Sequence, residues 1–422
     1  MRNIFRRSIT LAVSCGFVLA LATPTPAAGV SERERLDALL ARYDREPDGP
    51  GRAQLAAQID AFAHQKYATV SRLYWYVDLA SAKAAARAQG RPILHLRMLG
   101  KLDEDLSCAN SRLFRATLYA NRNVSAFLRE HFVLYWSSER PVPRVTIDYG
   151  DGRTIERTIA GNSAHYVLDE DGDLLDVLPG LYAPGMFQQE LERAAALAGR
   201  VRHQSAGERA RLLADHHQQR LSAAEQDWER LGAMPGMSDL RQRLTQPRNA
   251  PALIASERAT MSKMALEIKD VRRIAKELAS DLPSESEIET WSAAGRILYG
   301  TGAAALSSPV LDEASRALVV RLHQSSPQPW NSTREALDAM IARLEQTIVA
   351  DTALNQLQVR PQISREIVRR GGRVDFATLN AWIYDDVFRT PSQDPWLGLL
   401  PRDTFTGLPG DGVVLRSETG KR

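Results

Sequence analysis

Cys108 and Ser111 have the spacing of a redox Cys-x-x-Cys pair, with a hydroxyl group in place of the second sulfur. A single thiolate can attack a disulfide and form a mixed disulfide, but its release then requires an external thiol. Oxidation and reduction of a dithiol need two sulfurs, and this segment supplies one. The pair therefore predicts either a reactive monothiol or a buried, inert cysteine, which is a common state of free Cys.

The charges around Cys108 act in both directions. A helix that begins at Cys108 places the thiol at the positive end of the helix dipole, and Arg112 lies one turn further on; both favour the thiolate. Asp103, Glu104 and Asp105 precede the cysteine and oppose it. If the thiol is reactive, we expect Arg112 and Ser111 to tune it, with Ser111 donating a hydrogen bond to the sulfur.

The first 28 residues read as a secretory signal peptide, with a basic start, an apolar run over residues 9–22 and then small residues and prolines. A lipoprotein and an uncleaved anchor are the alternatives. Cys15 lies inside the apolar run, so cleavage leaves Cys108 as the single thiol, and no internal disulfide can form. We expect a periplasmic or secreted protein.

Composition excludes several classes of function. The chain has 54 basic and 51 acidic residues. Three of the basic residues belong to the predicted signal peptide, so the mature charge is zero and leaves no basic excess for nucleic acid. No membrane span is expected after signal cleavage. No haem motif, phosphate-binding loop or hydrolase motif occurs, so we expect no cofactor, and the oligomeric state stays open.

Apolar periodicity predicts the elements that position Cys108. In chain order they are a helix over 78–90, a strand over 92–97, a helix over 107–132, a strand over 132–138, hairpins over 145–159 and 163–180, and a helix over 183–199. Two short helices precede them in residues 31–66. After about residue 199 the pattern is helical almost throughout. A small mixed sheet flanked by helices fits this order.

The stretch from about Trp75 to Leu197 resembles a thioredoxin-like domain. Cys108 falls where that family's helix begins with its nucleophilic cysteine, and residues 161–172 resemble its strand and hairpin turn. The resemblance implies that Asn162 and Ser163 line a peptide-binding edge. Ser163 stands at the position of the family's cis-proline, so we expect a trans peptide bond beside Cys108.

The fold class that follows is α/β: a thioredoxin-like mixed sheet flanked by helices, followed by a mostly α-helical C-terminal domain. The predicted division is a signal peptide at 1–28, a helical segment at 29–70, the thioredoxin-like domain at 71–199, the helical domain at 200–390 and a Pro/Gly-rich tail at 391–422. The tail holds much apolar bulk, so we expect most of it to pack onto the body. The aromatic residues near the C-terminus are Trp382, Tyr384, Phe388, Trp396 and Phe405. They read as core, with a ligand groove as the alternative.

Histidines offer the remaining chemistry. His95 and His165 lie on predicted central strands and with Cys108 could form a copper site, although hydrogen-bonded core histidines are more common, and we assign no metal ligand. His216 and His217 are adjacent on a predicted helix and read as a solvated face. The acidic run Asp169–Asp173 reads as a hairpin turn.

Two functions from different classes fit the sequence. The first is an exported monothiol protein that forms mixed disulfides with the thiols or disulfides of client proteins through Cys108, with thiol-disulfide exchange as its activity. The second is a non-catalytic binding or scaffold module on a thioredoxin-like fold, with the helical region as its working surface. Burial of the Cys108 sulfur would favour the second.

Overall fold

The computed structural model describes residues 31–245, 252–260, 263–266, 282–299, 309–325, 333–390 and 396. The predicted signal peptide and almost all of the predicted tail lie outside these residues. A four-stranded mixed sheet forms the centre, in the order β2-β1-β5-β6. Its strands are β1 (Ile93–Met98), β2 (Val133–Ser138), β5 (Ala164–Leu168) and β6 (Leu174–Pro179).

Both β1 and β5 are flanked on two sides by other strands. β1 pairs with β2 in parallel, and β1 with β5 and β5 with β6 pair antiparallel. Every residue of β5 and β6 is buried. Burial of both faces explains why these strands are apolar almost throughout instead of alternating.

Four helical segments surround the sheet: α4 (Leu79–Gln89), α5 (Ala109–Leu113) continuing into the π-helix η1 (Phe114–Leu118), α6 (Arg122–His131) and α7 (Pro184–Val201). The predicted helix over 107–132 is interrupted between η1 and α6. Asn121 caps α6 there through its side chain, which accepts hydrogen bonds from Asn123 N and Val124 N.

The N-terminal segment is a helical hairpin with its own apolar cluster. It consists of α1 (Glu32–Arg45), α2 (Pro50–Ala63) and the short α3 (Ala68–Ser71). Ser31 and Glu34 form a capping box that begins α1. Leu36, Leu40 and Ile59 lie buried between the helices, so this hairpin matches the two helices predicted from the sequence.

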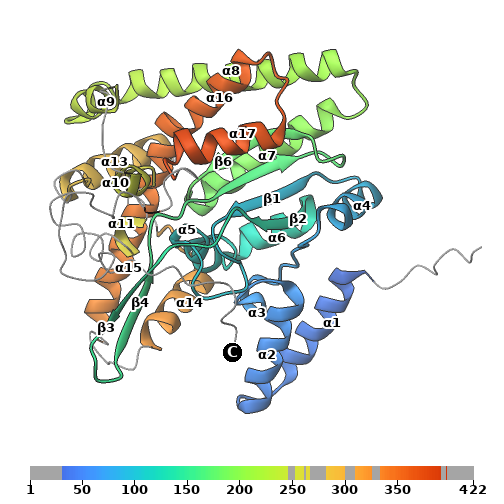
Figure 1. Ribbon diagram of the computed structural model, residues 1–422, viewed down its shortest axis with the longest axis vertical. Coiled ribbons are helices and arrows are strands. Elements are labelled where there is room, and N and C mark those ends of the chain that lie inside the picture. Colours follow the sequence, from blue (N-terminus) through green and yellow to red (C-terminus); the bar gives the residue numbers. More distant parts are fainter. Residues whose placement is uncertain are drawn as a thin grey trace, which may run out of the picture.

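The hairpin of β3 (Arg144–Asp148) and β4 (Thr154–Thr158) forms a separate two-stranded sheet. Gly150 and Gly152 have positive φ angles at its turn, which glycine adopts without strain. Figure 1 shows the hairpin reaching away from the central sheet. It leaves the sheet face that carries His95 and Tyr166 for another element to cover.

The C-terminal region supplies that cover. Its described helices are α8 (Ala206–Leu231), α9 (Met237–Thr245), α10 (Ala252–Arg258), α11 (Lys263–Leu266), α13 (Glu285–Tyr299), α14 (Glu313–Gln324), α15 (Arg334–Leu354), η4 (Asn355–Val359), α16 (Arg360–Arg369), α17 (Phe376–Trp382) and η5 (Ile383–Val387). Phe376 of α17 packs with its ring 5.1 Å from that of His95 and 4.9 Å from that of Tyr166. Asn380 accepts a hydrogen bond of 2.9 Å from the Tyr166 hydroxyl.

The sheet and the C-terminal helices share one apolar core. A single cluster of buried residues runs from Leu73, before the sheet, to Phe388, at the end of η5. Helices α8 and α16 pack on one another beside β6, at the top of Figure 1. Among the described helices, none combines the length and the apolar composition that a membrane crossing requires.

Candidate thiol site

Cys108 is the residue that caps the N-terminus of α5. Its amide donates to the Leu99 carbonyl just after β1, at 3.2 Å, and this bond holds the helix start against the end of the strand. The side chain has 0% exposure. Its Sγ lies 2.9 Å from Ser163 Oγ and 3.4 Å from Ser111 Oγ, so two hydroxyl groups surround a buried sulfur.

The predicted contact between Cys108 and Ser163 is confirmed. Gly161 makes it close, because a Cβ on Gly161 would collide with Cys108 Cβ. No cis peptide bond occurs among the described residues, so the bond before Ser163 is trans as expected. The approach of the two segments therefore rests on a glycine two residues before the serine.

Asn162 was predicted to line an open peptide-binding edge. In the structure it is buried against the chain's own helical region. Its Nδ2 donates to the Ser256 carbonyl at 3.2 Å, and its Oδ1 accepts a 2.7 Å bond from Thr260 Oγ1. A third bond of 3.4 Å runs from Nδ2 to the Phe388 carbonyl. Ser163 is buried as well. The two residues expected to bind a client protein are therefore covered by other parts of the same chain.

Arg112 points to the hairpin. Its Nη2 donates to Thr158 Oγ1 at 2.8 Å, at the end of β4. Ser111 does not donate to the sulfur as predicted: its Oγ accepts from the Cys108 thiol at 3.4 Å, and its own hydroxyl donates at 2.8 Å to the Cys108 carbonyl and Ser107 Oγ. Both residues predicted to tune the thiol thus have structural partners in addition to their place beside Cys108.

Arg115 organises the loop before Cys108 and was not singled out by the sequence. Its guanidinium is buried and donates to the carbonyls of Leu102 (2.8 Å) and Glu104 (2.5 Å) and to Ser107 Oγ (3.2 Å). Burial lowers its pKa below the ordinary value. The one signal in the sequence is its position in the predicted helix, about two turns after the helix start at Cys108.

The two strand histidines lie on opposite faces of the sheet. The β1–β5 register pairs Leu96 with His165 and His95 with Tyr166. Because side chains alternate along a strand, His95 and His165 point away from each other. They cannot converge with Cys108 on one ion, so the copper-site alternative does not fit this geometry.

Each strand histidine is a core residue with one polar partner. His165 Nε2 lies 2.7 Å from the Tyr119 hydroxyl, and His95 Nε2 lies 2.7 Å from Ser137 Oγ. Burial lowers the pKa of both imidazoles to about 3. They are neutral at physiological pH, which agrees with the expectation of hydrogen-bonded core histidines.

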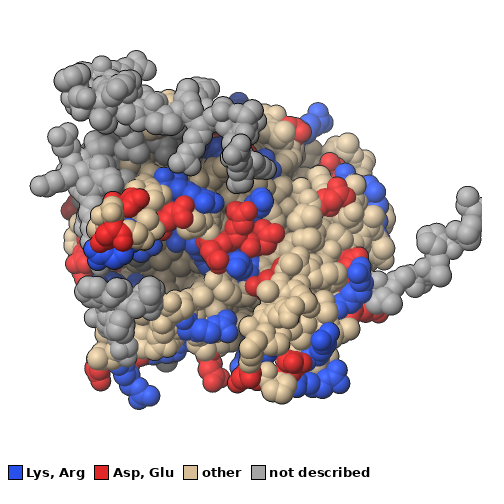
Figure 2. Space-filling view, turned by 60° about the horizontal axis from the view of Figure 1, so that its bottom comes forward, with Lys and Arg blue, Asp and Glu red and all other residues tan. Residues whose placement is uncertain are grey.

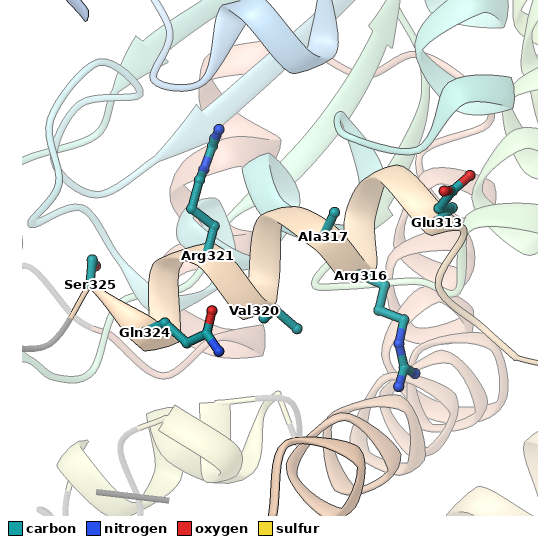
Figure 3. A pocket seen from close by; sticks show the side chains of 7 residues that line it. All are labelled: Glu313, Arg316, Ala317, Val320, Arg321, Gln324 and Ser325. Carbon is teal, nitrogen blue, oxygen red and sulfur yellow. The ribbon is translucent and has the colours of Figure 1, made fainter. Parts of the chain in front are cut away.

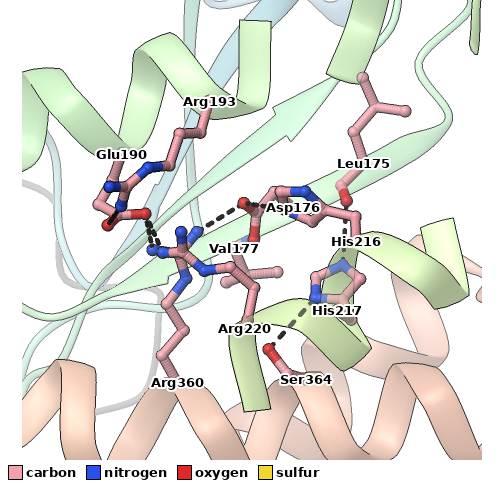
Figure 4. A network of polar contacts seen from close by, with 10 residues as sticks. All are labelled: Leu175, Asp176, Val177, Glu190, Arg193, His216, His217, Arg220, Arg360 and Ser364. Carbon is pink, nitrogen blue, oxygen red and sulfur yellow. Dashed lines mark hydrogen bonds and ion pairs between the residues drawn. The ribbon is translucent and has the colours of Figure 1, made fainter. Parts of the chain in front are cut away.

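His216 and His217 are buried, and the prediction of a solvated face is wrong. Figure 4 shows both directed toward β6. His216 Nε2 lies 3.1 Å from Asp176 Oδ2, and His217 Nε2 lies 3.2 Å from the Leu175 carbonyl. His217 therefore satisfies a carbonyl of β6, which is an edge strand of the described sheet. The fold explains the difference, since α8 lies against the sheet along the face that carries both histidines.

Asp176 and Glu190 share Arg360 in the same network. Arg360 Nη2 lies 2.5 Å from Asp176 Oδ2, and its Nη1 lies 2.5 Å from Glu190 Oε2. Arg220 also pairs with Glu190. Burial raises the pKa of Asp176, but Arg360 and His216 outweigh it, so the pKa ends well below its usual range. The network joins β6, α7, α8 and α16.

Asp176, His216 and His217 are residue types that bind metal ions, and they lie close together. Ligand atoms of Asp176, His216 and His217 lie within 4.8 Å of one another. Both nitrogens of His217 already have partners, Ser364 Oγ and the Leu175 carbonyl. Asp176 accepts from the Val177 amide on one oxygen and from Arg360 on the other. Because these atoms already have protein partners, the three residues fit an ion-pair and hydrogen-bond network better than a metal centre.

A shallow hollow of about 660 Å³ lies along α14. In Figure 3, Arg316 and Val320 point to one side of the helix and Arg321 to the other. Arg316 pairs with Asp338 of α15. On the face drawn in Figure 2, acidic and basic side chains are interspersed. The described lining comes from one helix, and nothing in it points to a ligand.

Comparisons with protein-family models, with curated proteins and with solved structures find no match to this chain. Among the sequence-predicted site residues, Cys108, Ser111, Asn162 and Ser163 come together, and Arg112 lies beside them with its guanidinium directed to the hairpin. The assembled site is closed by the chain that follows it.

Proposed function

We propose that the chain is an exported binding or scaffold module built on a thioredoxin-like unit, without catalytic use of its thiol. The strand order β2-β1-β5-β6, the Cys108 helix after β1 and the closing helix α7 support the resemblance drawn from the sequence. The single observation that carries the proposal is the complete burial of Cys108.

Thiol exchange requires the thiolate to approach a disulfide directly, so its rate depends on access to the sulfur. Cys108 is enclosed by Ser163, Ser111 and Gly161, and Asn162 is engaged by the chain itself. A client disulfide finds neither the sulfur nor the edge beside it. The working surface is then the exterior of the helical region.

Incubation of the native protein with glutathione disulfide tests this proposal, with intact mass as the readout. We expect no glutathione adduct on Cys108 in the native state and one adduct after denaturation. A Cys108→Ser variant should keep the fold and the surface. An adduct that forms readily on the native protein would overturn the non-catalytic assignment.

One observation favours a second candidate, a monothiol that forms mixed disulfides with extracytoplasmic client proteins. Ser163 Oγ lies 2.9 Å from the sulfur and can donate a hydrogen bond to it, and a hydrogen bond donated to a thiolate stabilises the thiolate. Client disulfides trapped on exported protein, and lost in Cys108→Ser, would favour this candidate over the first.

A further inference from the structure

The side chain of Asn162 joins the segment beside Cys108 to two later parts of the chain. Its amide nitrogen donates to the carbonyls of Ser256 and Phe388, and its amide oxygen accepts from Thr260. The side chains of Asn162 and Thr260 are fully buried. Every polar atom of this amide group thus has a partner, and two of the partners come from one short segment, 252–260.

Helix α11 lies next to α5, the helix that begins at the thiol. Lys263, the first residue of α11, donates from Nζ to the Ser256 carbonyl at 2.9 Å, which ties α11 to α10. α11 in turn packs against α5, whose N-terminal cap is Cys108. The polar contacts of Asn162 therefore hold α10, and through it α11, next to the helix that Cys108 caps.

We propose that α10 and α11 form a latch, fastened to Asn162 by Thr260 and Ser256, that opens locally and controls access to Cys108. The proposal goes beyond the proposed function, because it concerns how the site is closed and not what the closed protein binds. A closed thiol is latent, and opening of the latch exposes Cys108, Asn162 and Ser163 together.

The size of the two helices supports local opening. α10 has seven residues and α11 has four, and helices this short depend on tertiary contacts for their stability. Parts of a protein can open locally at a lower free energy than global unfolding. Loss of one buried hydrogen bond to Asn162 should therefore shift the opening equilibrium without unfolding the sheet.

Alkylation of native protein with N-ethylmaleimide measures this opening, with the modified Cys108 peptide quantified by mass spectrometry. Thr260→Val removes the hydroxyl that donates to the Asn162 amide oxygen. Tyr166→Phe is the matched control, since it removes a hydroxyl that donates to the amide oxygen of Asn380 at 2.9 Å. Thr260→Ser keeps the hydroxyl and tests rescue.

We expect Thr260→Val to speed alkylation of Cys108 about tenfold, the effect of one buried hydrogen bond. Tyr166→Phe and Thr260→Ser should leave the rate near that of the wild type. The latch is overturned if Thr260→Val leaves the rate unchanged, or if both hydroxyl deletions speed it equally in step with global unfolding by urea. In either case slow alkylation of the native wild-type protein would still support the non-catalytic module.

Discussion

Gly161 and Cys108 approach each other so closely that a side chain on the glycine has no room. The first carbon of any side chain at position 161 would collide with Cys108 Cβ and approach Val142. This contact links the segment before β5 to the start of α5, and it explains why the sulfur reaches Ser163. The residues around Cys108 are therefore closely packed, and the sulfur has hydrogen-bond partners in Ser163 and Ser111.

Gly161→Ala should destabilise the protein by about 1–3 kcal/mol, the usual cost of overpacking a core. Gly185→Ala is the control, because nothing lies within 4 Å of a Cβ at that position in α7. Urea unfolding of the two variants and the wild type measures the free energies. Equal stability of all three chains would contradict the close contact.

His165 should make stability fall in acid. Its pKa is about 3 in the folded protein because of burial, against about 6.5 when unfolded. Between these values the unfolded chain binds the proton and the folded chain does not, so stability declines as pH decreases from about 6.5 to 3. The loss approaches about 3 kcal/mol near pH 4.5.

Comparison of unfolding free energies across this pH range, in wild type and in His165→Gln, isolates that contribution. Glutamine can keep a polar contact with Tyr119, which lies 2.7 Å from His165 Nε2, and it does not titrate. The variant should show a shallower decline in acid. Parallel pH curves for the two proteins would show that His165 is not a buried neutral group.

At the scale of elements, charged side chains fasten the helices to the sheet. Arg360, at the start of α16, meets Asp176 of β6 and Glu190 of α7, and all three are buried. The π-helix η4 ends immediately before Arg360. Removing one partner from a buried pair leaves an uncompensated charge, which costs much more than loss of an exposed pair.

Arg360→Met should therefore lower the free energy of unfolding by about 3–5 kcal/mol. Arg369→Met, on the same helix, is the control, since Arg369 is exposed and its partner Glu366 keeps a second ion pair with Arg370; little change in stability is expected there. Thermal or urea unfolding of both variants and the wild type measures the free energy that each substitution costs. Similar small effects from both substitutions would mean that the network contributes little to the attachment of α16.

Local patterns predicted the elements well and their contacts poorly. Alternation and glycine turns predicted both hairpins, and the sequence around Cys108 predicted its place at a helix start. Its contact with Ser163 was predicted only through the resemblance to a thioredoxin-like domain. The closure of the site depends on Asn162 meeting Thr260 and Phe388, which lie 98 and 226 residues further along the chain. No short-range pattern encodes such contacts. His216 and His217 were misplaced for the same reason, because their partners come from β6 and α16.

For the whole molecule, one continuous core joins the sheet to the C-terminal helices. The hairpin of β3 and β4 does not cover the sheet, and α17 covers the face that carries His95 and Tyr166. The C-terminal region thus completes the sheet that precedes it. The chemistry at Cys108 is set by this arrangement, since the covering segments come after residue 250.

A fragment that ends at residue 200 should fail to fold cooperatively, because it exposes the apolar surface that α8, α16 and α17 bury. Circular dichroism with urea unfolding, beside the full chain, checks this expectation. The fragment should give a broad, non-cooperative transition and bind an apolar dye. A sharp transition like that of the full chain would show an independent sheet domain.

The rate at which the native Cys108 thiol reacts with a small aromatic disulfide measures most directly whether the site is closed. The chain from residue 29 onward carries that thiol alone. Near pH 8, we expect reaction at least about a thousandfold slower than that of free cysteine, since the reagent must wait for an opening, and rapid reaction of one thiol in denaturant. A native rate equal to that of free cysteine would contradict the account.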